Sequence, residues 1–282
     1  MKRIGKLYIC PTPIGNLEDI TLRTLNTFKE VDLIAAEDTR HTIKILNHFN
    51  IRKPLTSYHE HNKKEKGKVL INKLLEGDSI ALVSDAGMPG ISDPGEDIIK
   101  EVIEQNIEVD VLPGATASIL ALILSGLSTD KFVFEGFLSS KSKERKTRLE
   151  ELKTEYRTMI LYESPHRLKD MLKDVLEVFN DRRVAVAREL TKRHQEVFRG
   201  NLEKAIEKFN DENPRGEFVI IIEGIPKERL EDIEKNAWEG ISIKEHILTY
   251  MDKGFTKKDS IKKVSKEREI PKREVYKESI DL

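Results

Sequence analysis

The first half of the chain alternates short, wholly apolar runs with stretches whose apolar residues recur every three or four positions. A wholly apolar run of four or five residues is typical of a strand buried in a parallel sheet, whereas three-to-four spacing is typical of an amphipathic helix. The pattern predicts strands at residues 7–10, 32–36, 80–83 and 109–112, and a short one at the start of residues 55–62. Repeated strand–helix units of this kind favour a parallel sheet with helices on both faces.

The helices expected between these strands are marked by apolar residues on one face. Leu22, Leu25 and Phe28 share a face of the first helix, and Ile43 and Leu46 mark the second. Further helices are expected at residues 66–75, from residue 96 onwards and up to residue 124. We therefore expect an α/β domain at residues 1–125.

The loop at residues 84–95, SDAGMPGISDPG, is the feature around which this half is organised. It follows the apolar strand at residues 80–83 and is too rich in glycine and proline to form a helix before Glu96. A plain strand-to-helix turn needs only ~2–6 residues. Loops at the carboxyl ends of parallel strands are where open α/β sheets bind ligands, and glycines let a ligand approach the backbone. The sequence therefore predicts a ligand-binding loop here.

The second half has strands that follow one another with fewer helices between them. Strands are expected at residues 132–137, 158–162, 183–187 and 218–222. The basic stretch at residues 141–148 is expected as a loop, Ser164 and Pro165 are expected to begin a long helix, and Asn201 is expected to cap a short one. This order favours a mixed sheet in a second α/β domain at residues 126–232.

The tail, residues 233–282, is expected to form a small helical extension. Ser242 with Glu245 and Thr256 with Asp259 have the spacing of capping boxes, and Pro271 is expected to open a third helix. Two interpretations stay open for this lysine-rich unit. It is either a helix-turn-helix-like unit that contacts RNA or a helical appendage with a solvated charged face.

Composition limits the classes of protein to which the chain can belong. The 282 residues carry a formal net charge of −1 and 35% charged residues, so any binding of nucleic acid must come from local basic patches. One cysteine excludes an internal disulfide and a cysteine-based zinc site. No apolar run approaches a membrane span, and the N-terminus leads straight into a strand, so we expect a cytoplasmic protein.

Common catalytic and phosphate-binding motifs are missing. The chain has neither GxxxxGK[ST] nor GxGxxG, no HExxH and no Gly-x-Ser-x-Gly elbow, and His59 and His61 have no further ligands nearby in sequence for a metal. What remains is a set of loops of Pro, Gly, Ser, Thr and Ala with isolated acids. Such loops suit a ligand with an adenine edge, ribose hydroxyls and little phosphate, and S-adenosylmethionine has this character.

A set of ordered sequence blocks resembles one known family. The blocks are PTPIGNLEDIT (11–21), AAEDTRHT (35–42), SYHEHN (57–62), SDAGMPGISDPG (84–95), LPGATA (112–117), YESPHRL (162–168), RELTKRHQE (188–196) and GEFVIIIEG (216–224), with IPKREVYK (270–277) in the tail. Together they resemble the family of bacterial ribosomal RNA small-subunit methyltransferase I, within the tetrapyrrole methylase superfamily. The resemblance spans nearly the whole chain.

The resemblance implies a fold, a cofactor and a reaction. It implies two α/β domains of the tetrapyrrole methylase type, with S-adenosylmethionine in the cleft between them, usually in a homodimer. The implied reaction is methylation of the ribose 2′-hydroxyl of a cytidine in the decoding centre of 16S ribosomal RNA. The implied partner is 16S rRNA or the small ribosomal subunit. From the residues themselves we expect neither a membrane partner nor a metal.

Site residues follow from the resemblance by position. The expected cofactor-binding residues are Pro11, Asp85, Gly87, Met88, Pro89, Ser92, Thr116, Ala117 and Tyr162. Two positions depart from the family pattern, since Met88 stands where the family usually has Thr and Ser139 where it usually has Pro. The first departure removes a hydroxyl beside the expected site, and the second bears on the conformation of the basic stretch.

A ribose hydroxyl is a poor nucleophile and benefits from a base that accepts its proton. The candidates in the sequence are Glu37, Asp38, Asp85, Glu163 and His166. Glu163, at a strand end beside a helix, is favoured, although it could equally bind a cofactor amine or Arg167. The residues expected to contact RNA are Arg40, Lys141, Arg145, His166, Arg167, Arg188 and Lys192.

Two other functions are considered. The first is a precorrin-like tetrapyrrole methyltransferase of the same superfamily, which the basic stretch and the lysine-rich tail disfavour because a small substrate needs no such surface. The second is an RNA-binding protein without enzymatic activity, which the glycines and prolines of the loops disfavour because binding alone needs no pocket so free of side chains.

Overall fold

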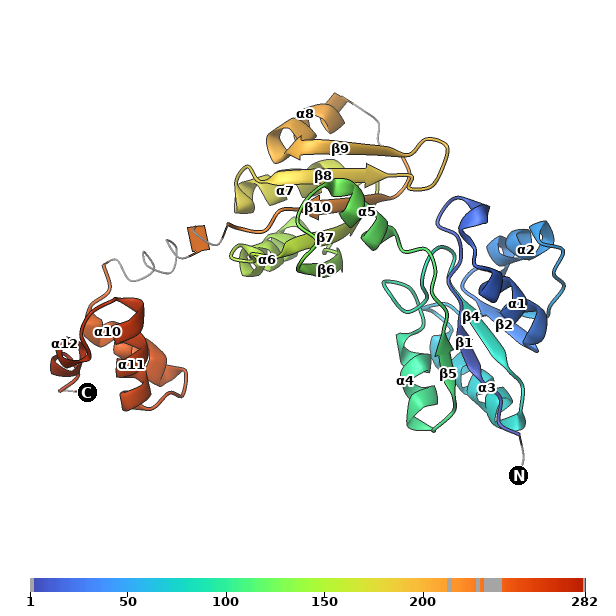
Figure 1. Cartoon of the computed structure of the whole chain (residues 1–282), viewed down its shortest axis with the longest axis horizontal. Coiled ribbons are helices and arrows are strands. Elements are labelled where there is room, and N and C mark those ends of the chain that lie inside the picture. The colour runs from blue at the N-terminus through green and yellow to red at the C-terminus, as the bar shows by residue number, and fades with distance from the viewer. Residues whose placement is uncertain (1–2, 212–214, 227–228, 231–239, 281) are drawn as a thin grey trace. The chain divides into compact units, whose positions relative to one another are not determined.

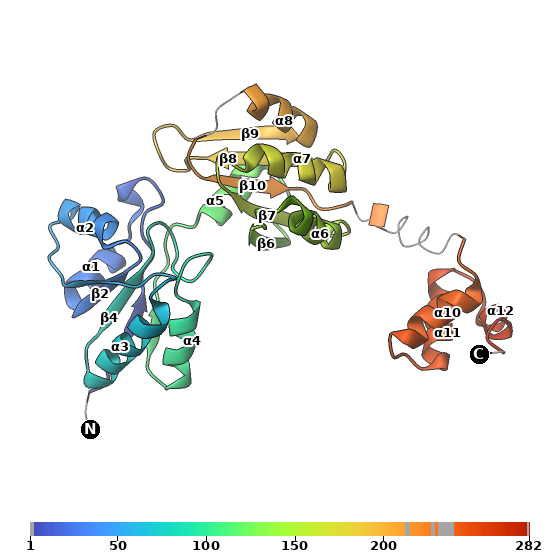
Figure 2. The ribbon, with the colours of Figure 1, turned by 180° about the vertical axis from the view of Figure 1, so that it is seen from behind.

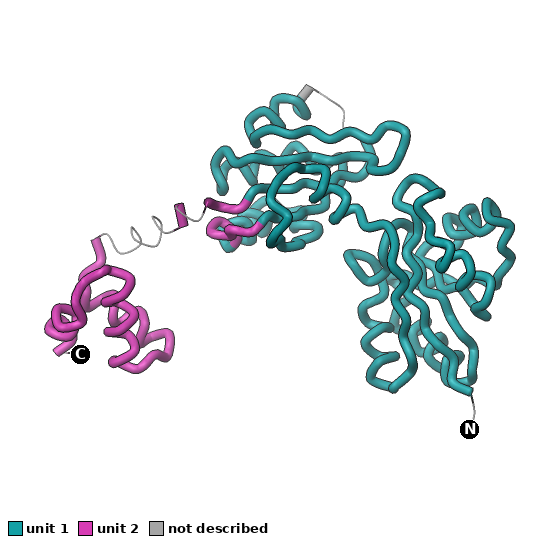
Figure 3. Tube along the Cα trace, viewed as in Figure 1, with its two compact units in different colours: residues 1–151, 158–223 teal, residues 152–157, 224–282 magenta. Residues whose placement is uncertain are grey.

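The structure is a computed structural model that describes residues 3–211, 215–226, 229–230, 240–280 and 282. The chain forms two compact units (Figure 3). The first contains residues 1–151 and 158–223, and the second contains residues 152–157 and 224–282. The predicted α/β region at residues 1–125 falls in the first unit, and so does most of the one at 126–232, of which residues 152–157 and those from 224 onwards belong to the second unit. The predicted boundary at residues 232–233 lies outside the described residues, and the division into three domains stays a prediction.

A parallel sheet forms the first half of the first unit (Figure 1). Its strands are β1 (Leu7–Ile9), β2 (Leu33–Ala36), β3 (Leu55–Ser57), β4 (Ile80–Val83) and β5 (Val109–Val111). The strand order is β3-β2-β4-β1-β5, and every pair is parallel. All of these strands were predicted, and the parallel sheet is confirmed.

Helices cover both faces of this sheet, as predicted (Figure 2). They are α1 (Leu22–Glu30), α2 (Thr39–His48), α3 (Lys63–Glu76) and α4 (Glu96–Glu104), with a short 3-10 helix, η1 (Leu17–Asp19), before α1. Leu70 of α3 and Ile98 of α4 pack with Ile9 and Leu82 on one face. Phe28 of α1 packs on the other.

The buried face of α1 differs from the predicted one. Leu22 is 80% exposed, and the buried residues of this helix are Thr24, Thr27 and Phe28. The hydroxyl groups of Thr24 and Thr21, the N-cap residue, lie 2.9 Å apart in a hydrogen bond, which makes burial of the polar Thr24 side chain acceptable. A prediction that counts only apolar residues misses such a face.

A mixed sheet forms the second half of the first unit. Its strands are β6 (Phe132–Phe137), β7 (Thr158–Glu163), β8 (Arg183–Arg188), β9 (Glu196–Asn201) and β10 (Phe218–Ile222), in the order β6-β7-β10-β8-β9. β6 and β7 are parallel and the other pairs are antiparallel, so the mixed sheet is confirmed. The edge strand β9 was not predicted. Its residues are all partly or fully exposed, so they lack the apolar run of a buried strand.

The helices of this half are α5 (Ala117–Ser125), α6 (Ser142–Leu152), α7 (Leu168–Phe179) and α8 (Leu202–Asp211). Two predictions were wrong here. The basic stretch expected as a loop is the helix α6, and α7 begins at Leu168 because residues 164–167 form a turn. Asn201 does cap α8, since its side-chain oxygen accepts a hydrogen bond of 3.3 Å from the Lys204 amide.

The second unit contains the helices α10 (Ile243–Asp252), α11 (Lys257–Glu267) and α12 (Lys272–Lys277). The capping box of Ser242 and Glu245 is present, and Thr256 caps α11, as predicted. Ile247, Val264 and Val275 are fully buried in a small core shared by the three helices. Among the described residues, none of the helices is long and apolar enough to cross a membrane.

Candidate functional site

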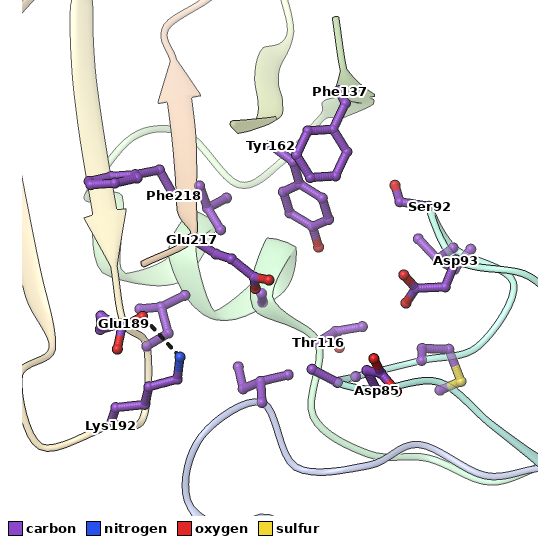
Figure 4. Close-up of a pocket in the computed structure, with 18 of the residues that line it drawn as sticks. Asp85, Ser92, Asp93, Thr116, Phe137, Tyr162, Glu189, Lys192, Glu217 and Phe218 are labelled. Atoms are coloured by element: carbon purple, nitrogen blue, oxygen red, sulfur yellow. Dashed lines mark hydrogen bonds and ion pairs between the residues drawn. The ribbon is translucent and has the colours of Figure 1, made fainter. Parts of the chain in front are cut away.

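A cavity of about 260 Å³ lies within the first unit (Figure 4). The loops that follow β2, β4 and β5 form one side of it. The other side comes from the second half of the unit, from β6, β7, the β8–β9 loop and the start of β10. The loop at residues 84–95, which the sequence predicts to bind a ligand, therefore lines this cavity.

The backbone of this loop is held by the loop that follows β1. Thr12 and Gly87 form an antiparallel bridge, with N–O distances of 2.9 and 3.0 Å in its two hydrogen bonds. Further along, a Cβ atom on Gly95 would lie 3.1 Å from the Cα atom of Gly90, so only glycine allows the loop to close on itself. Ser92 has a φ of +64°, a strained conformation of the kind that clusters at functional sites.

Aromatic rings form part of the opposite wall. The ring of Tyr162 packs edge-on against Phe134 and Phe137, with centroid distances of 5.1 and 5.5 Å. Tyr162 and Phe137 line the cavity, and the Tyr162 hydroxyl points into it (Figure 4). Burial raises the pKa of Tyr162, so this hydroxyl stays protonated and acts as a hydrogen-bond donor.

Carboxylates dominate the charge of the cavity. Its lining includes Glu37, Asp85, Asp93, Glu189 and Glu217, with Lys192 as the one cation among the lining residues. The Lys192 ammonium lies 2.9 Å from Glu189 and is thereby neutralised locally. The cavity is therefore acidic, and it favours a ligand that carries positive charge.

The acids of the first sheet are linked through backbone hydrogen bonds. The amide of Asp38 donates to Asp85 at 2.9 Å, and the amide of Asp85 approaches Glu37 at 3.5 Å. Burial, and then the charge of Asp85, raise the pKa of Glu37. Burial raises the pKa of Asp93 to about 7, with further contributions from Glu37, Glu217 and Asp85.

Most of the predicted cofactor-binding residues lie together. Those that line the cavity are Asp85, Gly87, Met88, Ser92, Thr116, Ala117 and Tyr162. Pro11 is buried instead against Gly114, and a Cβ atom on Gly114 would lie 2.3 Å from the Pro11 ring. Pro89 lines a neighbouring apolar hollow beside α4 and β5.

The two departures from the family pattern have local roles. Met88 lines the cavity and also packs against the core beneath the sheet, so its side chain replaces a hydroxyl with apolar surface. Ser139 donates a hydrogen bond of 2.7 Å to Glu144 and accepts one of 3.3 Å from the Lys141 amide. Ser139 thus supports the first turn of α6.

Glu163, the favoured base in the sequence, does not line the cavity. Its side chain is fully buried, and one carboxylate oxygen lies 3.2 Å from the Arg167 guanidinium and 2.8 Å from the Ser164 amide. Burial raises its pKa despite these partners. The geometry corresponds to the alternative in which Glu163 holds Arg167.

The residues expected to contact RNA fall into two groups. Arg40, Lys141, His166 and Lys192 are exposed, and three of them form ion pairs at the surface, Arg40 with Asp38, Lys141 with Glu144 and Lys192 with Glu189. Arg188 lies 2.5 Å from Glu196, and Arg167 donates to the Leu138 carbonyl at 2.6 Å, so both are engaged within the fold.

Arg145 differs from the expectation of a surface contact. It is 3% exposed, and its guanidinium donates to Asp174 of α7 at 2.8 Å and to the Ser139 carbonyl at 3.0 Å. Because these bonds are buried, Arg145 joins α6 to α7 and has no exposed group for a phosphate. In a sequence it looks like its exposed neighbours, because nothing in the basic stretch marks which residue faces the core.

Sequence reasoning did not select three lining carboxylates, Asp93, Glu189 and Glu217. Asp93 lies in the loop that the sequence singled out, and Glu217 lies directly before a buried strand in a block of the family pattern. An acid next to a strand end was a usable signal for Glu217. Nothing in the sequence brings these two acids together, because 124 positions separate Asp93 from Glu217 and only the fold places both at the cavity.

Comparison with known proteins identifies the family. The family model of the tetrapyrrole (corrin/porphyrin) methylases matches residues 6–206. The chain is 51% identical over 272 residues to a ribosomal RNA small subunit methyltransferase I of Halalkalibacterium halodurans, covering 96% of this chain and 93% of the relative. A relative of the same name from Thermotoga maritima is 50% identical and covers 78% of this chain and 99% of its own length.

Solved structures show the same fold at low sequence identity. A diphthine synthase matches with a TM-score of 0.63 and 14% identity, over 78% of this chain and 90% of its own. A uroporphyrin-III C-methyltransferase from Thermus thermophilus, solved with S-adenyl homocysteine, matches with a TM-score of 0.55 and 17% identity, over 78% and 97% of the two chains. On the sequence matches together with the fold, the chain belongs to the ribosomal RNA small subunit methyltransferase I family of the tetrapyrrole methylases.

Proposed function

We propose that the protein uses S-adenosylmethionine to methylate the ribose 2′-oxygen of a cytidine in the decoding centre of 16S ribosomal RNA. The observation that carries the proposal is the acidic cavity at the strand ends of the parallel sheet, in a chain about half identical to ribosomal RNA small subunit methyltransferases over nearly its whole length. The alternative with a tetrapyrrole substrate is supported by the description of the family model and by fold neighbours of low identity, whereas the relatives about half identical to this chain are named ribosomal RNA methyltransferases.

The residues of the cavity fit this cofactor. Its carboxylates suit a ligand with a positive sulfur and an ammonium group, and Ile14, Leu190 and Val219 supply apolar walls for an adenine ring. Gly87 leaves the loop backbone free of a side chain where it lines the cavity. Asp85, Ser92, Thr116 and Tyr162 would supply polar contacts, and the absence of a phosphate-binding motif agrees with a cofactor that has no phosphate.

When bound, the cofactor supplies an activated methyl group on a positively charged sulfur. The protein's part is to place the acceptor oxygen in line with that methyl group, and such positioning is worth about 7–11 kcal/mol of the barrier. Phe137, Ile91 and Met88 add apolar surface to the cavity lining, which would shield a bound cofactor from water. Excluding water strengthens the interaction between the carboxylates and a cation held among them.

The acidic cavity also separates the cofactor from the RNA backbone. Phosphates are repelled by the cavity carboxylates, so the RNA must be held by cations outside it. Lys141, Arg40 and Lys192 are exposed and would exchange their present carboxylate partners for phosphates, with the exposed His166 side chain beside them. Shape recognition of a structured rRNA needs such phosphate contacts rather than base readout in a groove.

The test uses purified full-length protein, labelled S-adenosylmethionine and small ribosomal subunits that lack their own methylation. We expect label on RNA, mapped to a ribose 2′-oxygen of a decoding-centre cytidine. Label on a base, or no label on RNA while the cofactor still binds, contradicts the proposal. Free 16S rRNA in a parallel reaction tells whether the naked RNA or the assembled subunit is the substrate.

A homodimer and a cytoplasmic location accompany this proposal as predictions. Sedimentation of the purified protein across a range of concentrations tests the first. The RNA-contacting role of α10–α12 is likewise a prediction.

A further inference from the structure

Charge is distributed unevenly along the chain, and the helices α10–α12 of the second unit carry an excess of cations (Figure 1). Between Ile243 and Lys277 the sequence has eleven lysines and arginines and six acids, whereas the whole chain has a formal net charge of −1. The rest of the chain is therefore net acidic. A polyanion is attracted to the part that contains these helices.

The best-ordered acids of these helices are used within the fold. Glu245 completes the capping box of α10, and Asp259 accepts the hydroxyl of the residue that caps α11 at 2.6 Å. Glu267 of α11 accepts the Tyr250 hydroxyl of α10 at 2.5 Å. These three carboxylates hold helix ends and a helix contact, and in the described part of the unit none of them forms an ion pair with a lysine.

One face of α11 carries a row of lysines. Lys258, Lys262 and Lys266 are spaced by four residues, so they lie on one side of the helix, about 6 Å apart along its axis. All three are exposed, and the buried Ile261 and Val264 mark the opposite side. Within the residues that the structure describes, none of the three lysines forms an ion pair or a side-chain hydrogen bond.

The short helix α12 adds two cations and an exposed ring. Arg273 and Lys277 lie one turn apart, on the side away from the buried Val275, and both are exposed without an ion pair among the described side chains. Tyr276, beside Lys277, is 61% exposed. Cations beside an exposed aromatic ring suit RNA, because the cations pair with phosphates and an unstacked base can lie on the ring.

Lys263 shows the contrast with a lysine of α11 that serves the fold. Its ammonium lies over the rings of Phe255 and Tyr250, 4.8 and 5.3 Å from their centroids. The three lysines of the row have no such contact among the described residues, so the folding of the unit does not account for them.

We propose that a basic surface, formed by Lys258, Lys262, Lys266, Arg273 and Lys277, binds the phosphate backbone of ribosomal RNA. It adds affinity for the substrate and takes no part in the methyl transfer. The inference rests on the proposed function and extends it to the second unit. Charge complementarity selects the occupant, since a row of unpaired cations at regular spacing fits a regular row of phosphates.

A comparison of lengths supports the separation of binding from chemistry. The family model matches residues 6–206, and α10 begins at Ile243. The Thermotoga maritima relative is covered over 99% of its length by an alignment of 221 residues, which is shorter than the span from residue 6 to α10. An alignment that contains the family region therefore does not reach the three helices, so nearly the whole of that relative is accounted for without them.

The first experiment measures binding of the full-length protein to isolated 16S rRNA and to small subunits across a salt series. Lys258→Gln with Lys262→Gln is expected to weaken binding by about ten-fold at low salt. The slope of log affinity against log salt is expected to fall by about 2, one for each phosphate contact that is lost.

The matched control removes the same charge at the same spacing from another helix. Lys64 and Lys68 of α3 are exposed and four residues apart. Lys64→Gln with Lys68→Gln is expected to leave the affinity and the salt slope unchanged. An equal loss in both double variants overturns the inference, because net charge alone then explains the binding.

Steady-state methylation of small subunits separates affinity from chemistry. Lys258→Gln with Lys262→Gln is expected to raise KM for the subunit about as much as it weakens binding, and to leave kcat unchanged. Binding of S-adenosylhomocysteine is expected to stay the same. A lower kcat at saturating subunit overturns the separation of the basic surface from the methyl transfer.

A further variant tests the exposed ring. Tyr276→Leu keeps an apolar side chain and removes the aromatic face, so RNA binding is expected to weaken several-fold. The salt slope is expected to stay as in the wild type, because stacking releases no counterions.

Vesicles rich in anionic lipid test the other polyanion that such a surface could bind. Vesicle binding that Lys258→Gln with Lys262→Gln abolishes, while binding of the subunit is unchanged, assigns the surface to a membrane and overturns the inference. A wild-type protein that does not methylate the subunit overturns the proposed function, whereas the salt series still decides whether the basic surface holds RNA. An active wild type whose double variant keeps its affinity and slope overturns the inference alone.

Discussion

Two groups of buried charge in the first unit are built on opposite principles. At the contact of α6 and α7, Arg145 and Asp174 neutralise each other, and carbonyl oxygens accept further guanidinium hydrogen bonds. In the cavity, carboxylates lie among other carboxylates with one lysine at the edge. Paired burial holds two helices together, whereas unpaired burial costs stability and prepares a site for a cation.

Breaking the paired group is expected to have the largest effect on stability. Arg145→Ala leaves the buried Asp174 with only Lys146 at 3.5 Å and the Ser142 hydroxyl at 2.9 Å, so we expect the lower part of the about 3–5 kcal/mol that breaking a buried ion pair typically costs. Urea unfolding of the full chain, followed by circular dichroism, measures the change. The exposed neighbour Lys141→Ala, on the same segment, is the control and is expected to leave the midpoint almost unmoved.

The comparison also predicts how that cost is recovered. Arg145→Met combined with Asp174→Leu removes both charges and keeps apolar volume. The stability of this double variant is therefore expected to be much closer to that of the wild type than the stability of either single variant. If Arg145→Ala were as stable as Lys141→Ala, Arg145 would not hold the two helices.

The free energy of unfolding is expected to depend on pH through Asp93, which belongs to the unpaired group. The folded pKa of Asp93, about 7, lies above its ordinary value of 3.8, so between these values the folded state binds more protons than the unfolded state. Stability contributed by this group is therefore lost as pH rises from 3.8 towards 7. Asp93→Asn lacks this loss and is expected to be the more stable protein at pH 8, by about 1–2 kcal/mol once solvent screening of a partly exposed group is counted.

Urea midpoints of both proteins at several pH values between 4 and 8 test this sign, roughly spanning the two pKa values of such a carboxyl. The difference between wild type and variant should grow with pH and then level off. If the difference between the two midpoints does not change with pH, the ionised carboxylates of the cavity do not lower the stability of the fold.

The smallest effects are expected at exposed cations. Lys192→Ala is expected to weaken binding of small subunits or 16S rRNA by a few fold and to reduce the slope of log affinity against log salt by about 1. Filter binding across a salt series measures both. Arg145→Met with Asp174→Leu is the matched control, because a buried arginine contributes no counterion release and should leave the slope unchanged.

The parallel sheet could be predicted from the sequence because its strands are buried on both faces. Residues 80–83 are all apolar and all buried, so composition alone marks them. The edge strand β9 has no such run, and α6 was missed because a helix with charged residues on nearly every side has no apolar stripe to detect. Leu149 and Leu152 are buried there, but Arg145 takes the position of a third core residue.

The site was predictable only in part. The glycines and prolines of residues 84–95 indicated a ligand-binding loop. Seven of the residues that line the cavity were predicted from the family pattern to bind the cofactor. The environment of Asp93 was not predictable, because its neighbours Glu37 and Glu217 come from two other segments of the chain. A pKa depends on distances in the fold, which local sequence does not encode.

The thiol of Cys10 can report how often the sheet opens at the edge where the cavity lies. Cys10 is completely buried directly after β1, its amide donates to the Leu82 carbonyl at 2.9 Å, and burial raises its pKa so that it is unreactive while the fold is closed. A thiol reagent can therefore modify the native protein only when this edge opens. The rate of modification counts those openings, and any ligand that bridges the strand-end loops should slow it.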